Sequence, residues 1–154
     1  MTHLYLIKHA QADGLKPGII GSMTPNSGLS PLGITQALCL RDRLAATGEI
    51  QADVLISSTL KRAWETAEII APALKFPVIA DDEIQELDFG DLEGLTEAEV
   101  EARFGFFSLD HEPFHRHGST GESGGEFTFR SCRALIVLRA HMQAKRLSLS
   151  PMGE

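Results

Sequence analysis

Short apolar runs alternate with amphipathic segments along much of the chain, and this alternation constrains the fold more than any other feature. Residues 4–7 and 54–56 are compact apolar runs, typical of strands that are buried on both faces. Segments with helical periodicity follow each of them, and residues 78–80 predict a third strand. The order of these elements predicts an α/β fold, with a mostly parallel sheet and helices on both of its faces.

The predicted helices carry their own boundary signals. Ser30 and Pro31 are typical of an N-cap and a first helical position, and Gly48 is placed to end that helix. A second helix is predicted after candidate caps at residues 57–59, and Pro72 should end it. Two capping boxes, each a Ser or Thr three residues before a Glu, predict further helix starts at Thr96 with Glu99 and at Ser123 with Glu126.

Length and charge limit the classes of protein that this chain can represent. A chain of 154 residues suits one domain, and we expect residues 1–154 to form a single domain. Lys and Arg number 14 against 21 Asp and Glu, and this balance argues against nucleic-acid or anionic-membrane partners. No apolar run approaches the roughly 20 residues that span a bilayer. The first residues lack the pattern of a secretion signal, so we expect a cytoplasmic protein.

Four short segments carry candidate chemistry. Lys8 and His9 lie at the exit of the first predicted strand, where an imidazole held by a backbone carbonyl could attack phosphorus. Arg62 falls in the first turn of the second predicted helix, where free N–H groups favour an anion. Glu86 lies in an acidic turn, and a protonated carboxyl there could donate to a leaving oxygen. The fourth segment is Gly-Glu-Ser at residues 121–123.

Each segment alone has a plainer interpretation: an ordinary histidine, a solvated arginine that opens a helix, or an acidic turn. Together and in this order, they resemble the histidine phosphatase superfamily, also called the phosphoglycerate mutase-like family. Its pattern is Arg-His-Gly, then Ser-Ser-x-x-x-Arg-Ala-x-x-Thr-Ala, then Glu-x-x-x-Gly-x-x-Glu-Gly, then Gly-Glu-Ser. The matching positions in the second and third segments are Ser57, Ser58, Arg62, Ala63, Thr66, Ala67, Glu86, Gly90, Glu93 and Gly94.

The resemblance implies hydrolysis of a phosphomonoester through a phosphohistidine, with no cofactor and no metal. It implies that His9 is the nucleophile, that Lys8 and Arg62 bind the phosphate, and that Glu86 is the general acid. The expected rim of the pocket consists of Gly21, Glu122 and Ser123. The implied partner is a small phosphorylated metabolite or inorganic phosphate.

The chain departs from the family pattern in three places. Ala10 stands where glycine is usual, and Lys8 replaces an arginine, so charge is kept but bidentate geometry is lost. The family also has a second catalytic histidine, followed by glycine, at the end of a strand after its last long helix. No His-Gly pair follows residue 145 here, and His141 falls inside the predicted helix. We therefore expect a truncated or frame-shifted member with reduced activity that lacks the last core strand, for which residues 147–149 could supply a short replacement.

Other functions stay open on the sequence. They are a catalytically inactive module that binds phosphate or a partner, a phosphoglycerate mutase, and a remnant without function. The His- and acid-rich residues 110–117 fit no standard zinc spacing and favour a lid loop. The basic residues of the last helix favour a solvated helix face over a nucleic-acid site. An exposed sheet edge would favour self-association into a homodimer.

Overall fold

The computed structural model describes residues 3–14, 16–105 and 112–149, with side chains described as far as residue 140. The elements within these ranges are α1 (Pro31–Thr47), β1 (Leu55–Ser57), α2 (Lys61–Leu74), β2 (Val78–Ala80), the 3-10 helices η1 (Asp82–Ile84) and η2 (Gly90–Leu92), α3 (Glu97–Phe104) and α4 (Gly124–Leu149). The fold is α/β, as the alternation of the sequence predicts.

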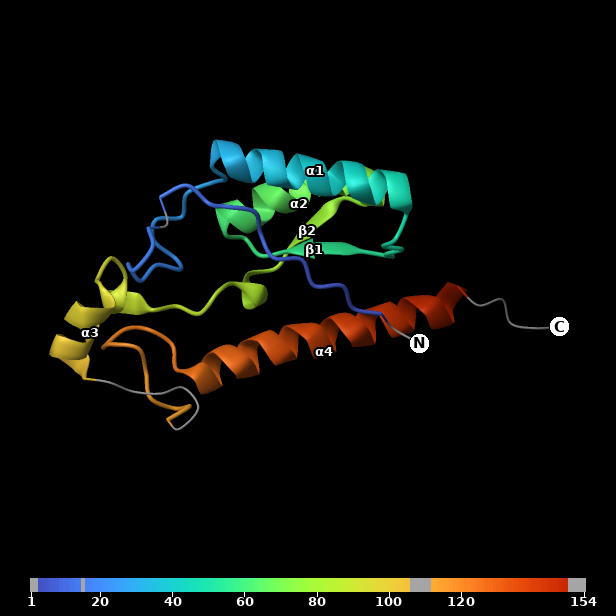
Figure 1. Cartoon of the computed structure of the whole chain (residues 1–154). Coiled ribbons are helices and arrows are strands. Elements are labelled where there is room, and N and C mark those ends of the chain that lie inside the picture. Colours follow the sequence, from blue (N-terminus) through green and yellow to red (C-terminus); the bar gives the residue numbers. More distant parts are fainter. Residues whose placement is uncertain (1–2, 15, 106–111, 150–154) are drawn as a thin grey trace.

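β1 and β2 pair in parallel, with Leu55 opposite Val78 and Ser57 opposite Ala80. α2 connects the two strands and supplies the crossover that a parallel pair requires. Figure 1 shows α1 and α2 together on one side of the strands and α4 along the other side. The prediction of parallel strands with helices on both faces is therefore confirmed, although the sheet of the described residues has two strands.

Several predicted helix boundaries are confirmed. Ser30 caps α1 by accepting a hydrogen bond from the Gly33 N–H at 3.0 Å, and Pro31 is the first helical residue. Gly48 ends the helix in a left-handed conformation with φ of 60°, and its N–H donates to the Leu44 carbonyl. Reciprocal capping-box hydrogen bonds join Thr96 with Glu99 and Ser123 with Glu126.

α2 differs from the prediction at both ends. Its N-cap is Leu60, an apolar side chain that cannot accept a hydrogen bond, so the serines before it are not the cap. The Asn26 Oδ1 accepts the Lys61 N–H at 2.8 Å in their place. The helix also continues through Pro72 to Leu74, because a proline this close to the helix end costs only one intrahelical hydrogen bond.

Residues 4–7 do not form the predicted buried strand. Their apolar side chains are all exposed, from 38% for Ile7 to 81% for Leu6. Among the described residues β1 and β2 pair only with each other, so the N-terminal segment is not paired with either strand. The prediction was wrong because an apolar run indicates a tendency to be buried, whereas a strand also needs a partner for its N–H and C=O groups.

α4 is longer than the predicted final helix. It extends to Leu149, so the suggestion that residues 147–149 form a replacement strand is wrong. His141 lies inside this helix, as predicted. Among the helices of the described ranges, none combines the length and hydropathy needed to cross a bilayer.

The core of the described chain lies between α1, α2 and β1. Leu44, Ile70 and Leu74 are buried there, and Leu55 of β1 packs against them. α4 stands apart from this cluster: a cavity of about 750 Å³, lined mainly by apolar side chains, separates it from the sheet. The helix therefore adds little to the core beneath α1 and α2.

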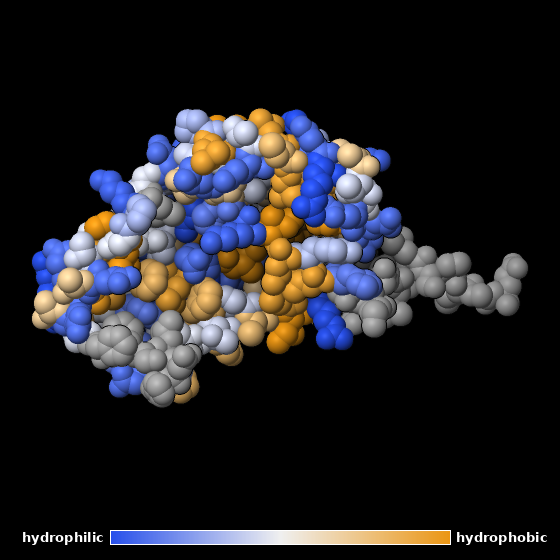
Figure 2. Space-filling model, viewed as in Figure 1, coloured by the Kyte–Doolittle hydropathy of each residue, from blue (hydrophilic) through white to orange (hydrophobic). Residues whose placement is uncertain are grey.

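We expect the folded chain to bind an apolar dye such as anilinonaphthalene sulfonate. Leu6 on the N-terminal segment is 81% exposed and Ile136 on α4 is 69% exposed. Figure 2 shows a hydrophobic band that crosses the middle of this face of the molecule, and large exposed apolar patches attract apolar ligands. Leu6→Ser and Ile136→Ser should each lower the dye fluorescence. A response no larger than that of a well-packed domain of the same size would contradict this expectation.

Candidate active site

His9 follows the extended N-terminal segment and is fastened to the start of α2. The Ala10 N–H donates to Thr66 Oγ1 at 3.1 Å, and the same hydroxyl donates to the Arg62 carbonyl at 2.8 Å. Thr66 is buried and lies one turn after Arg62 on α2. The position of His9 is therefore set by a side chain more than fifty residues away in the sequence.

Both ring nitrogens of His9 have partners whose chemistry fixes the tautomer. Nδ1 lies 2.7 Å from the Ala10 carbonyl oxygen, which can only accept a hydrogen bond. Nε2 lies 3.2 Å from Nε of Arg62, which can only donate. Nδ1 must therefore carry the proton, and the lone pair of Nε2 faces the guanidinium. An imidazole in this state presents an unprotonated nitrogen, which accepts a hydrogen bond from a cation.

Arg62 is buried, with only 3% of its surface exposed, so the interpretation of a solvated arginine is wrong. Its Nη1 donates to the Ser22 carbonyl at 2.8 Å. Burial lowers the pKa of Arg62, while the carboxylates of Glu86 and Glu93 act in the opposite direction. A guanidinium titrates so far above neutrality that it keeps its charge here. The site thus holds one fixed cation that can contact an anion.

Glu93 organises the loop that faces Arg62. Its Oε1 accepts hydrogen bonds from the Ser22 N–H at 3.2 Å, the Ser22 hydroxyl at 2.6 Å and the Met23 N–H at 2.6 Å, and its Oε2 accepts from the Thr24 N–H. Burial opposes ionisation of Glu93, but these donors prevail and hold its pKa below the ordinary value. Sequence reasoning matched Glu93 to the third segment and gave it no role, because its partners lie some seventy residues earlier.

We expect Glu93→Gln to destabilise the fold at neutral pH by about 1 kcal/mol, because the amide offers one uncharged acceptor where the carboxylate has two charged ones. A carboxyl whose pKa is lowered by folding stabilises the native state above its unfolded value of 4.5, and this contribution is lost as pH falls through the lowered pKa. The difference in unfolding free energy should therefore shrink below pH 4.5. Denaturant unfolding at several pH values tests this, with Glu101→Gln on exposed α3 as the control. A difference that is independent of pH would contradict it.

Glu86 lies between η1 and η2, in a stretch without regular secondary structure. Its side chain is exposed, and its Oε1 accepts the Leu87 N–H at 2.9 Å. Its charge raises the pKa of Arg62. Within the described residues its side chain makes no hydrogen bond or ion pair with His9 or Arg62, so the role of Glu86 stays a prediction.

The remaining predicted site residues make no hydrogen bond or ion pair with the His9 and Arg62 side chains within the described part of the chain. Lys8 is exposed, and within the described residues it forms no hydrogen bond or ion pair. Gly21 is half-buried and adjoins Ser22, whose carbonyl binds Arg62. Ser123 is buried and caps α4. Glu122 pairs with Arg130 at 2.7 Å. Neither of these last two residues makes a hydrogen bond to His9 or Arg62 in the described part of the chain, so their place at a pocket rim stays a prediction.

The His- and acid-rich stretch is only partly described, because residues 110 and 111 lie outside the described ranges. His117 is buried, and its Nδ1 lies 2.6 Å from the Glu122 carbonyl. Arg116 forms an ion pair with Glu126. Within residues 3–14, 16–105 and 112–149 no group of three or more metal-ligand side chains is close enough to hold an ion. The described part of this stretch thus forms hydrogen bonds and ion pairs within the protein.

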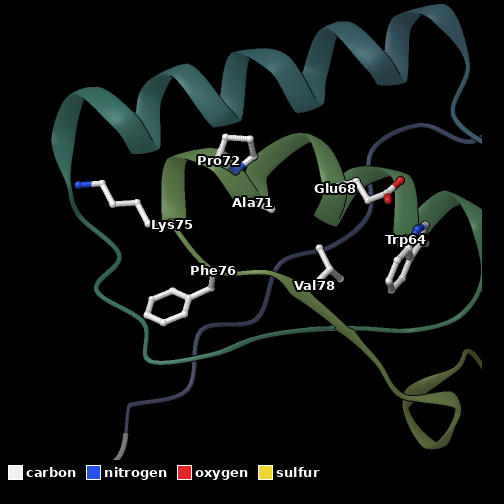
Figure 3. Close-up of a pocket in the computed structure, with 7 residues that line it drawn as sticks. All are labelled: Trp64, Glu68, Ala71, Pro72, Lys75, Phe76 and Val78. Carbon is white, nitrogen blue, oxygen red and sulfur yellow. The ribbon is translucent and has the colours of Figure 1, made fainter.

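A cavity of about 480 Å³ lies against α2 and the start of β2, and Figure 3 shows the residues that line it. Trp64 and Glu68 contribute from α2, and Phe76 and Val78 come from the segment that enters β2. Neither His9 nor Arg62 lines this cavity. It is therefore separate from the candidate active site.

The chain matches a known protein family over nearly its whole length. The model of the histidine phosphatase superfamily (branch 1) matches residues 4–149, which is nearly the entire chain. The chain belongs to this superfamily. The histidine phosphatase fold therefore accounts for the α/β architecture.

Individual histidine phosphatases resemble the chain over part of their length. A 2,3-bisphosphoglycerate-dependent phosphoglycerate mutase from Methylobacterium sp. (strain 4-46) is 38% identical over 106 residues, covering 66% of this chain and 50% of the relative. A putative phosphoserine phosphatase 2 from Hydrogenobacter thermophilus is 34% identical over 94 residues, which cover 61% of this chain and 44% of the relative. The chain thus spans about half the length of these curated relatives.

A solved histidine phosphatase structure agrees with the fold. The mycobacterial glucosyl-3-phosphoglycerate phosphatase superposes with a TM-score of 0.72 and 28% identity, covering 86% of this chain and 61% of that one. The same protein has been solved in complex with VO3 and with inorganic phosphate. The part of the fold described here is therefore shared with a larger phosphatase.

Proposed function

We propose that the chain is a phosphomonoester hydrolase that works through a phosphohistidine on His9. The observation that carries the proposal is the contact between His9 and Arg62: the Nε2 lone pair faces a buried guanidinium at 3.2 Å, and the proton sits on Nδ1. This is the state in which an imidazole attacks phosphorus. The structural relative has been solved with VO3 and with inorganic phosphate, which supports a phosphate ligand for this chain.

The reaction proceeds in two steps. Nε2 of His9 forms a bond to phosphorus while the ester P–O bond breaks, and the protonated carboxyl of Glu86 gives its proton to the departing alcohol. Water then attacks the phosphohistidine, its proton passes to the Glu86 carboxylate, and the N–P bond breaks to release inorganic phosphate. The Arg62 guanidinium stabilises the charge on the oxygens of the phosphoryl group during transfer, together with Lys8, the residue before His9.

Lys8 bears on the rate that this chain can reach. An ammonium is a point donor, whereas a guanidinium can bind two phosphate oxygens at once. We expect Lys8→Arg to raise kcat for an aryl phosphate by about 10-fold or more, the scale of gaining one oxyanion donor. Lys16→Arg, the same exchange on an exposed lysine, is the control. An unchanged or lower kcat for Lys8→Arg would show that residue 8 does not touch the transferring group.

Two alternatives have their own support. A phosphoglycerate mutase is favoured by the similarity to the Methylobacterium relative, and a catalytically inactive phosphate-binding module is favoured by the buried charge of Arg62. A mutase transfers the phosphoryl group to an acceptor alcohol, whereas a hydrolase transfers it to water. An inactive module binds phosphate without releasing it from any ester.

The test is release of inorganic phosphate from 4-nitrophenyl phosphate by the chain, followed by the same measurement with 3-phosphoglycerate present as acceptor. Hydrolysis that the acceptor does not divert supports the proposal. Transfer to the acceptor supports the mutase. No turnover, together with a rise in melting temperature on addition of phosphate, supports the binding module.

A further inference from the structure

Arg130, in the second turn of α4, uses all five of its N–H donors. Nε and Nη2 bind the two carboxylate oxygens of Glu122 at 2.8 and 2.7 Å. Nη1 donates to the carbonyls of Glu83 at 2.7 Å and Gln85 at 3.2 Å. Nη2 also donates to the carbonyl of Glu86 at 3.4 Å. One side chain therefore forms hydrogen bonds with the backbone on both sides of residue 84 and at Glu86 itself.

The environment of Arg130 strengthens these hydrogen bonds. Its side chain is 18% exposed, and its guanidinium lies 5.4 Å from the ring centroid of Phe127. The hydrogen bonds of Glu122 raise the pKa of Arg130, and those of Arg130 lower the pKa of Glu122. A bidentate, half-shielded pair of this kind is stronger than an exposed ion pair.

Glu122 holds the backbone on the C-terminal side of Glu86, at Asp88. Its backbone N–H donates to the Asp88 carbonyl at 2.8 Å, and its Oε2 accepts the Asp88 N–H at 3.2 Å. The stretch from residue 85 to residue 89 has no helix or strand of its own to hold it. Arg130 and Glu122 thus supply the fixed points of the main chain on either side of Glu86.

We propose that Arg130 is a positioning residue for proton transfer, which holds the Glu86 carboxyl where it can reach the leaving oxygen. This inference rests on the proposed function, in which Glu86 is the proton donor. General acids must lie within hydrogen-bond reach of the oxygen that they protonate, and small displacements reduce the rate steeply. Arg130 never touches the reacting atoms; it acts through the main chain that carries Glu86.

Comparing substrates with different leaving groups distinguishes a role of Arg130 in proton transfer from a role in stability alone. An alkoxide leaving group needs its proton during bond cleavage, whereas 4-nitrophenolate leaves without help. Loss of the proton donor should therefore slow hydrolysis of an alkyl phosphate such as ethyl phosphate and spare 4-nitrophenyl phosphate. The comparison uses kcat/KM, which reports formation of the phosphohistidine and excludes the second step, in which Glu86 takes a proton from water. Glu86→Gln should lower kcat/KM for ethyl phosphate by about 10²-fold or more. Arg130→Ala should lower it by about 10-fold or more, and each variant should change kcat/KM for 4-nitrophenyl phosphate by less than about 3-fold.

Matched variants complete the design. Arg133→Ala removes an exposed neighbouring arginine of α4 that pairs with the half-buried Glu83 side chain, and it should leave kcat/KM for both substrates unchanged. In a Glu86→Gln background, Arg130→Ala should cause no further loss on ethyl phosphate, because both changes remove the same proton transfer. Arg130→Lys keeps the charge without the five-donor fork, so it should reproduce the leaving-group effect and serve if the alanine variant does not fold.

The outcomes distinguish this inference from the function on which it rests. Equal losses on both substrates for Arg130→Ala, or a further loss in the Glu86→Gln background, would overturn the positioning role and leave the proposed hydrolase standing. A Glu86→Gln variant without any leaving-group effect would overturn the assignment of Glu86 as proton donor. Absence of turnover in the unaltered chain would overturn the proposed function, and the inference with it.

Discussion

His9→Ala should abolish the hydrolysis of phosphomonoesters, with a fall in kcat on the order of 10³-fold or more. The variant removes the only protein atom that bonds to phosphorus in the proposed reaction, and the Arg62 guanidinium alone cannot replace it. Steady-state release of phosphate from 4-nitrophenyl phosphate measures the effect. The fold should survive, because the Ala10 N–H keeps its hydrogen bond to Thr66 whatever side chain precedes it.

The control for this variant is His3→Ala, which removes an exposed imidazole from the same N-terminal segment. We expect its rate to match that of the unaltered chain. Equal phosphate release by His9→Ala and the unaltered chain would mean that the activity arises from another group or from a contaminant. The proposed nucleophile would then be wrong.

Arg62→Ala should remove both catalysis and phosphate binding. The guanidinium lies against Nε2 of His9, and loss of one such donor costs about 10²–10³-fold in kcat. Phosphate at 100 times its Kd should stabilise the unaltered chain by about 2.7 kcal/mol, which is a rise of about 5–10 °C in Tm for a domain of this size. The variant should show almost none of this rise, as measured by thermal unfolding with and without phosphate.

A stability measurement without ligand and one control variant serve to interpret the Arg62 result. Arg62→Ala also leaves the buried Ser22 carbonyl without its donor, so a loss of about 1–3 kcal/mol in stability is expected without any ligand. Lys61→Ala removes the adjacent exposed cation and should keep the full phosphate response. A phosphate-induced rise in Tm that persists in Arg62→Ala would place the anion elsewhere on the molecule.

The parts of the fold and site that the sequence predicted are those encoded locally. Ser30, Gly48 and the capping boxes act within one turn of the residues they fix, so residue types at short spacing suffice to place them. His9 and Arg62 lie 53 residues apart, yet they meet. Each lies where an extended segment ends or a helix begins, and such positions gather at one edge of an α/β sheet.

The parts that could not be predicted depend on distant partners. The strand expected at residues 4–7 needed to pair with another strand, and an apolar run carries no information about whether that pairing forms. Arg130 binds backbone carbonyls more than forty residues earlier, and every residue has a carbonyl, so no residue pattern marks these acceptors. Sequence reasoning placed Arg130 on a solvated basic face for this reason.

The proposed reaction transfers the phosphoryl group of the ester to Nε2 of His9. Rapid quenching of the chain with 4-nitrophenyl phosphate in alkali, followed by fragmentation mass spectrometry, would locate the phosphoryl group on a peptide. We predict an adduct on the His9 imidazole that is stable in alkali, is lost in acid, and is absent from His9→Ala. A phosphoryl group on any other side chain during turnover, or turnover with His9 never modified, would contradict the account.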